Sequence, residues 1–253
     1  MQDKLTPRQS RAWGLCALSV PAAMVLAGRG WLWVLAGSAA ASGIVLFLQT
    51  LQRRSGQSLP EQMARAFGQH GGRLLGAAVC LWLLLAASGA AAASQIAFED
   101  DLGPLAPAVP LLLAALASRK GQAAAARVSG VLALCLALLY SIIALASLRH
   151  VQAAWCRPWG SAADAGLSLC LCLTPACLLF LDGPGQTPRP GWSALAAAVL
   201  PGVAALLCSA CLSPAWTAQL PQPLYTLTKS LSVLSVMQRF ELLLSTAQLL
   251  GLV

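Results

Sequence analysis

Long apolar runs, separated by short polar links, recur along the whole chain and set the strongest limit on its fold. Hydrophobic residues make up 58% of the chain and charged residues only 9%, a composition that the surface of a soluble domain could not accept. The sequence therefore predicts an all-α, polytopic membrane helix bundle that forms one transmembrane domain over residues 1–253. The predicted helices cover about residues 12–28, 31–51, 74–98, 108–117, 128–148, 165–181, 192–212 and 231–253.

The basic residues predict the orientation of these helices. They are scattered singly between apolar runs, which argues against a nucleic-acid partner and in favour of a topology signal. With a cytoplasmic N-terminus, the inside segments carry eleven Lys and Arg residues and the outside segments carry four: Arg29, Arg149, Arg157 and Lys229. The positive-inside rule therefore predicts that the N-terminus faces the cytoplasm.

Two of the predicted helices contain an interruption at a comparable place. Thr174 and Pro175 lie in the middle of the apolar stretch Leu167 to Gln186, and Ser19 and Pro21 interrupt the first apolar run. Proline removes a backbone donor, and a broken helix persists at membrane depth only where protein, water or a ligand satisfies the freed groups. Paired interruptions in two halves of a chain indicate a secondary-transporter site, although a proline alone can simply bend a membrane helix.

Other chemistry receives little support from the sequence. Eight of the nine cysteines lie inside apolar segments, where Cys behaves as a small hydrophobe, and only Cys156 lies in a predicted loop. The cysteines have no second pair or His partners at metal spacing. We find no nucleophile with a base and no phosphate-binding glycine motif, so the sequence predicts no metal, no cofactor and no enzyme.

The most specific stretch runs from Pro223 to Glu241 and reads Pro-Leu-Tyr-Thr-Leu-Thr-Lys, followed by Arg239-Phe-Glu241. It resembles a stretch of the endospore germination permeases, the B subunits of nutrient germinant receptors. Four weaker resemblances to that family follow in the same order along the chain: Leu5 to Gln9, Ala27 to Gly37, Ser55 to Glu61, and Ala126-Arg127.

This resemblance implies an APC/LeuT-like fold, in which ten helices form two inverted repeats and the ligand binds between broken helices 1 and 6. It also implies a small nutrient, such as an amino acid, as ligand, and the germinant receptor A and C subunits as partners. The location would be the bacterial cytoplasmic membrane or the spore inner membrane. The chain departs from the family in ending at helix 8 and in reading Thr174-Pro-Ala-Cys-Leu178 where the family carries an acidic residue.

The expected site residues follow from the two interruptions. Small side chains there leave room for a compact ligand, and the N-terminus of a half-helix favours its carboxylate. The expected ligand-binding residues are Ser19, Val20, Pro21, Ala22, Ser88, Thr174, Pro175, Ala176 and Cys177. For Ser88, a hydrogen bond to its own helix is the competing interpretation.

Arg239 and Glu241 lie near the start of the last predicted helix. Two residues apart on a helix, they do not face each other. We expect a structural or gating role for both, since intramembrane charges usually face the bundle interior with a partner.

Three functions remain open from the sequence. The first is a permease-like protein that binds a small nutrient and signals or transports it. The second is a scaffold subunit or degenerate paralogue that binds no ligand, which the missing helices 9 and 10 favour. The third is an ordinary amino acid transporter of the APC superfamily.

Overall fold

The computed structural model describes residues 12, 15–16, 25–57, 59–102, 108, 112, 115–116, 119, 122–174 and 192–231. It gives the backbone alone for 59, 86–87, 90–91, 93–102, 122–126 and 192–198. Within these residues all regular structure is helical and there is no strand, which confirms the all-α class. Parts of predicted helices 1, 4 and 6, and all but one residue of predicted helix 8, lie outside the described residues.

Helices of very different length follow one another along the chain. They are η1 (Leu26–Gly28), α2 (Trp31–Ser55), α3 (Leu59–Leu102), α5 (Gln122–Ser147), η3 (Ala153–Cys156), α6 (Ala162–Cys172), α8 (Trp192–Leu212), α9 (Pro214–Thr217) and α10 (Pro223–Ser230). Among the described residues, two segments are long and apolar enough to cross a membrane: α2 and the part of α5 from Arg127 to Ser147.

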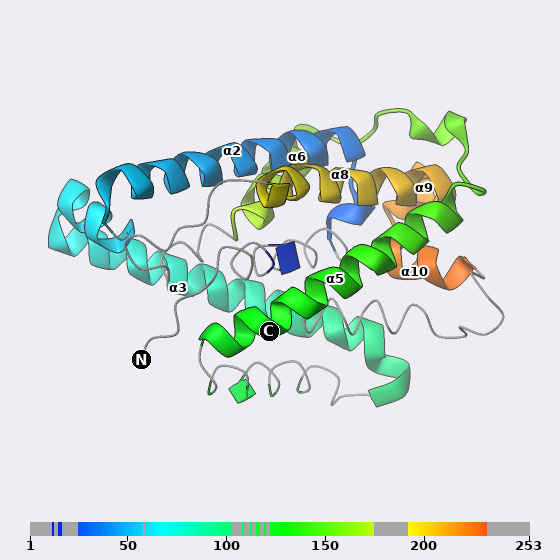
Figure 1. The fold of residues 1–253 in the computed structure, drawn as a ribbon. Coiled ribbons are helices and arrows are strands. Elements are labelled where there is room, and N and C mark those ends of the chain that lie inside the picture. The colour runs from blue at the N-terminus through cyan, green and yellow to red at the C-terminus, as the bar shows by residue number, and fades with distance from the viewer. Residues whose placement is uncertain are drawn as a thin grey trace.

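Helix α2 packs along both α6 and α8 (Figure 1). A Cβ atom at Gly37 of α2 would overlap the carbonyl oxygen of Ala165 and lie 2.9 Å from Cβ of Ser168, both on α6. A Cβ atom at Gly202 of α8 would lie 3.0 Å from Cβ of Leu35 on α2. Glycine at these two positions therefore lets the helix backbones approach closely, as small residues do in membrane helix pairs.

A hydrogen bond joins α2 to α6 beside this contact. The Ser168 hydroxyl donates to the Val34 carbonyl oxygen at 2.8 Å, and both residues are fully buried. Because the carbonyl also belongs to the α2 backbone, the bond fixes how far α6 lies along α2 as well as how close it lies.

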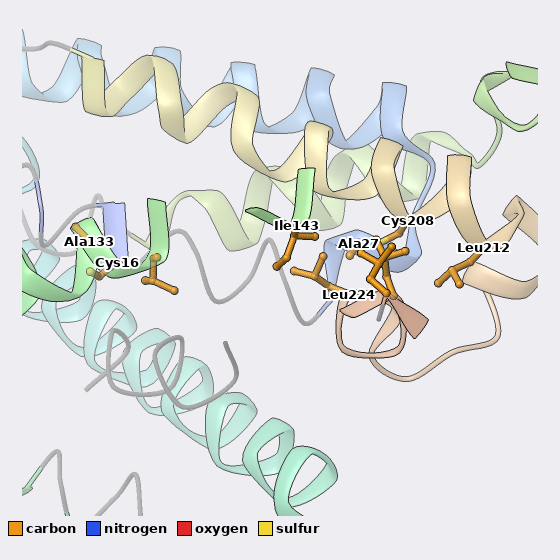
Figure 2. Close-up of a cluster of buried hydrophobic side chains, with 10 residues drawn as sticks. Cys16, Ala27, Ala133, Ile143, Cys208, Leu212 and Leu224 are labelled. Carbon is orange, nitrogen blue, oxygen red and sulfur yellow. The ribbon is translucent and has the colours of Figure 1, made fainter. Parts of the chain in front are cut away.

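A cluster of buried side chains connects α5 to η1, α8 and α10. Figure 2 shows Ala27, Ile143, Cys208 and Leu224 converging from these four elements. Helix α5 carries a buried stripe at helical spacing, with Ser129, Ala133, Leu136, Ile143 and Ser147. The opposite side of α5 is apolar and exposed.

The polar residues 52–73 predict a loop between the second and third membrane helices, with a short amphipathic helix from Leu59 to Phe67 in it. Helix α2 continues to Ser55, and Gly56, with φ 63°, ends it in the left-handed conformation. The short amphipathic helix is confirmed, because Gly68, with φ 75° and ψ 171°, kinks α3 directly after Phe67. The long helix after this kink begins before the predicted 74, and α2 ends after the predicted 51, because Arg and Gln are good helix formers.

The prolines Pro214, Pro221 and Pro223 predict a long loop over 213–230, but the structure has two short helices there. Ser213 accepts a hydrogen bond from the Trp216 backbone N–H, and Pro214 opens α9. Pro223 opens α10, which buries Leu224 and Leu227. The loop prediction was wrong because it took the prolines as helix breakers, whereas proline is favoured in the first turn of a helix.

The contact at Gly37 can be tested against a second glycine of α2. We expect Gly37→Ala to lower the free energy of unfolding by about 1–3 kcal/mol, because the added methyl group has no space. At Gly43 a Cβ atom meets nothing within 4 Å, so Gly43→Ala should change it by less than about 1 kcal/mol. Thermal unfolding of the detergent-purified protein measures both, and equal effects would contradict the close approach of α2 and α6.

Candidate functional site

Helix α6 is short and apolar. Its eleven residues span about 16 Å, whereas the hydrocarbon core of a bilayer is about 30 Å thick. A turn at Leu173 follows it, just before Thr174 and Pro175, where we predict an interruption. Leu173 keeps right-handed helical φ and ψ, its backbone N–H bonds to the Leu169 carbonyl oxygen at 3.1 Å, and Thr174 is helical again. The residues from 175 to 191 lie outside the described residues.

The start of α6 is fixed by polar contacts. Ser161 and Asp164 form a capping box, in which the Asp164 Oδ2 atom accepts the Ser161 backbone N–H at 3.0 Å. The same carboxylate pairs with the Arg29 guanidinium at 3.6 Å, and its side chain is only 9% exposed, against 51% for Arg29. Gly160, with φ 91°, leaves room for this carboxylate, since a Cβ atom there would overlap it.

The end of α6 is fixed by Thr174. Its hydroxyl donates to the Leu171 carbonyl oxygen at 2.7 Å and accepts the Trp82 indole N–H of α3 at 3.3 Å. The last carbonyls of a helix have no partner within the helix. Thr174 thus satisfies one of them and ties α3 to the end of α6.

Cys172, near this end, belongs to a buried cluster with Leu26 of η1, Ala205 of α8, and Val34 and Ala41 of α2. The next residue of α2, Ser42, is 7% exposed, and its hydroxyl oxygen is buried with no hydrogen-bond partner among the described residues. Leaving a buried hydroxyl unpaired costs about 1–3 kcal/mol, so Ser42 is a polar group that a bound molecule could satisfy.

Of the predicted ligand-binding residues that the structure describes, Thr174 lies at the end of α6 and Ser88 lies elsewhere. Ser88 is exposed on α3, and its hydroxyl donates to the Leu85 carbonyl oxygen of its own helix at 2.8 Å. Six residues along a helix rotate a side chain by about 240°, so Ser88 and Trp82 occupy different sides of α3. The other predicted residues lie outside the described residues: Ser19, Val20, Pro21, Ala22, Pro175, Ala176, Cys177, Arg239 and Glu241.

Two residues were not predicted: Trp82, which bonds to Thr174, and the buried Ser42 of α2. A tryptophan in the middle of an apolar run is a usable signal, because its N–H needs a partner when it leaves the membrane interface. Ser38 and Ser42, four residues apart, share one side of α2 and are both buried. In the described part of the chain, no three His, Cys, Asp or Glu residues gather where they could hold a metal ion.

No family model, curated protein or solved structure matches this chain.

The position of α6 depends on Asp164. We expect Asp164→Ala to lower the free energy of unfolding by about 1–3 kcal/mol, because it removes a helix cap and a charged hydrogen-bond acceptor. Arg29→Ala should cost less than about 1 kcal/mol, since half-exposed ion pairs are screened by solvent. Asp164→Asn, which keeps an oxygen for the Ser161 N–H, should fall between them. Thermal unfolding ranks the three variants, and an equal cost for the Arg29 and Asp164 alanine variants would assign the effect to the ion pair.

Proposed function

We propose that this chain is a polytopic integral membrane protein of the germination-permease kind and that it binds a small amino acid or similar nutrient where α6 is interrupted. The observation that carries the proposal is the turn at Leu173, which follows the buried Cys172 of α6 and precedes the Thr174 hydroxyl that accepts the Trp82 indole N–H. A helix that stops in the apolar interior needs partners for its last carbonyls. Thr174 supplies one, and a ligand would supply others.

The exposed side of α5 supports membrane insertion. Val131, Leu134, Leu138 and Leu145 follow one side of this helix and are between 61% and 72% exposed. A soluble monomer rarely carries such a continuous apolar surface. A lipid bilayer is the partner whose chemistry matches it, and the charge pattern of the sequence favours a cytoplasmic N-terminus.

The packing of α2 against α8 supports an arrangement in two halves. In the proposed fold these are the second helices of the two repeats, helices 2 and 7. Equivalent elements of two repeats meet where they lie near the axis that relates them. In this fold α6 is the first helix of the second repeat, and it lies beside α2.

The polar groups at the site support an amino acid as ligand. The C-terminal end of α6 carries the negative end of the helix dipole, which favours an ammonium group. Ser42 offers an unpaired hydroxyl, and Ala41, Cys172 and Ala205 are small. The carboxylate would bind at a half-helix N-terminus in the interrupted helices.

As a member of a germinant receptor, the protein would act with A and C subunits in the spore inner membrane or in the bacterial cytoplasmic membrane. Binding would then be signalled to these subunits, or the nutrient would be transported.

A scaffold that binds no ligand is the second candidate. The hydroxyls of Thr174 and Ser88 already donate to carbonyls of their own helices. These two groups therefore need no ligand to satisfy them, and this observation favours the scaffold.

Thermal unfolding of the detergent-purified protein against a panel of amino acids separates the two candidates. A ligand at 100 times its Kd adds about 2.7 kcal/mol of apparent stability. We expect one or two amino acids to raise Tm. Ser42→Ala and Thr174→Val should each lower the affinity for that ligand at least tenfold and so reduce the Tm shift. Ser88→Ala is the matched control and should keep the shift.

The outcome that supports the scaffold is the absence of any shift across the panel in a sample that unfolds cooperatively. A shift that survives in both Ser42→Ala and Thr174→Val would place the ligand elsewhere in the protein.

A further inference from the structure

Two cysteines from distant parts of the sequence lie where η3 meets the end of α8. The Gln152 backbone N–H, directly before η3, donates to the Ala210 carbonyl oxygen at 3.0 Å. Cys156 of η3 donates from its Sγ to the Gln152 carbonyl oxygen at 3.6 Å, and Cys211 directly follows Ala210. Cys211 donates from its Sγ to the Ser147 carbonyl oxygen at 3.7 Å, so the backbone bond from Gln152 to Ala210 is what brings η3 to the part of α8 that carries Cys211.

Both thiols are partly accessible. Cys156 and Cys211 have intermediate exposure, whereas Cys208, one helical turn before Cys211, is fully buried. A disulfide needs the two Cα atoms within about 7 Å. The short element η3 has no buried residue, and the Trp31 indole N–H donates to the Cys156 carbonyl oxygen at 3.2 Å, so this hydrogen bond is the contact that a change in that separation would disturb.

The proposed orientation places both thiols on the side of the membrane opposite the cytoplasm. Arg149 and Arg157 flank η3 and belong to the few basic residues of the outside segments. Protein disulfides form and persist in compartments outside the reducing cytoplasm.

We propose that Cys156 and Cys211 are an oxidation site and form a reversible disulfide bond that ties η3 to the end of α8. The proposal rests on the membrane orientation given under the proposed function and is independent of the ligand. The bond would close a loop of 55 residues, since 211 minus 156 is 55, and loops of this length gain stability when cross-linked.

The oxidant is a disulfide, either that of a thiol oxidoreductase or a small-molecule disulfide. The Cys156 thiolate attacks one of its sulfur atoms, which forms a mixed disulfide and releases one thiol. The Cys211 thiolate then attacks the Cys156 sulfur, which forms the Cys156–Cys211 bond and releases the second thiol. The two protons lost by the cysteines are taken up by the two released thiolates, and the two electrons reduce the oxidant.

Thiol counting on the full chain in membranes tests the bond. Membranes are treated with oxidised glutathione, denatured and labelled with a mass-tagging maleimide. We expect the labelled thiols to fall by two, to return after reduction, and to yield a cross-linked peptide that contains Cys156 and Cys211. Tm of the oxidised protein should exceed that of the reduced protein.

Single variants assign the pair. Cys156→Ser and Cys211→Ser should each abolish the paired loss of thiols, and Cys208→Ser, one turn away on the same helix, should leave it unchanged. The proposal is overturned if no thiols are lost, or if the loss persists in Cys156→Ser through pairing of Cys208 with Cys211.

A membrane-impermeant maleimide added to intact cells tests the membrane orientation independently of the disulfide. Labelling of Cys156 from outside in the reduced protein supports the orientation. Labelling only after permeabilisation would show that the orientation is wrong. The premise of the disulfide would then be wrong as well. Labelling from outside without disulfide formation would overturn the disulfide alone.

Discussion

The close approach of α2 to α6 and α8 is the constraint on which the rest of the described structure depends. In a bilayer, lipid tails are as apolar as the side chains, so helices associate through tight packing and hydrogen bonds. Gly37 and Gly202 allow this packing, and the bond from Ser168 to Val34 adds a directional contact. Without these contacts α6, which has eleven residues, has little to hold it in place.

Different contacts hold the two ends of α6. At its start, Asp164 accepts the Ser161 N–H and pairs with Arg29. At its end, Thr174 bonds to Leu171 and Trp82. The first end is defined by residues close in sequence together with one ion pair. The second end depends on α3, which is distant in sequence.

The sequence predicted local features of this structure better than contacts between distant residues. Helix α8 has the predicted bounds 192–212, and the Thr-Pro pair indicated where α6 stops. Trp82 and Thr174 are separated by 92 residues, so no local pattern reveals their hydrogen bond. The prolines of 213–230 were ambiguous because proline ends one helix and opens another, and only the buried face of α10 decides between these roles.

The two glycine contacts of α2 also limit how this helix can move. Gly37 meets α6, and Leu35, two residues earlier, meets Gly202 of α8. Gly37 and Leu35 lie at the two edges of the buried stripe that contains Val34, Ser38 and Ala41, so α6 and α8 contact the two edges of one face of α2. Turning α2 about its own axis would drive the Gly37 and Leu35 surfaces out of both contacts at once. The rotation of α2 is therefore fixed by its two neighbours, and a displacement of α2 at Gly37 would move α2, α6 and α8 together.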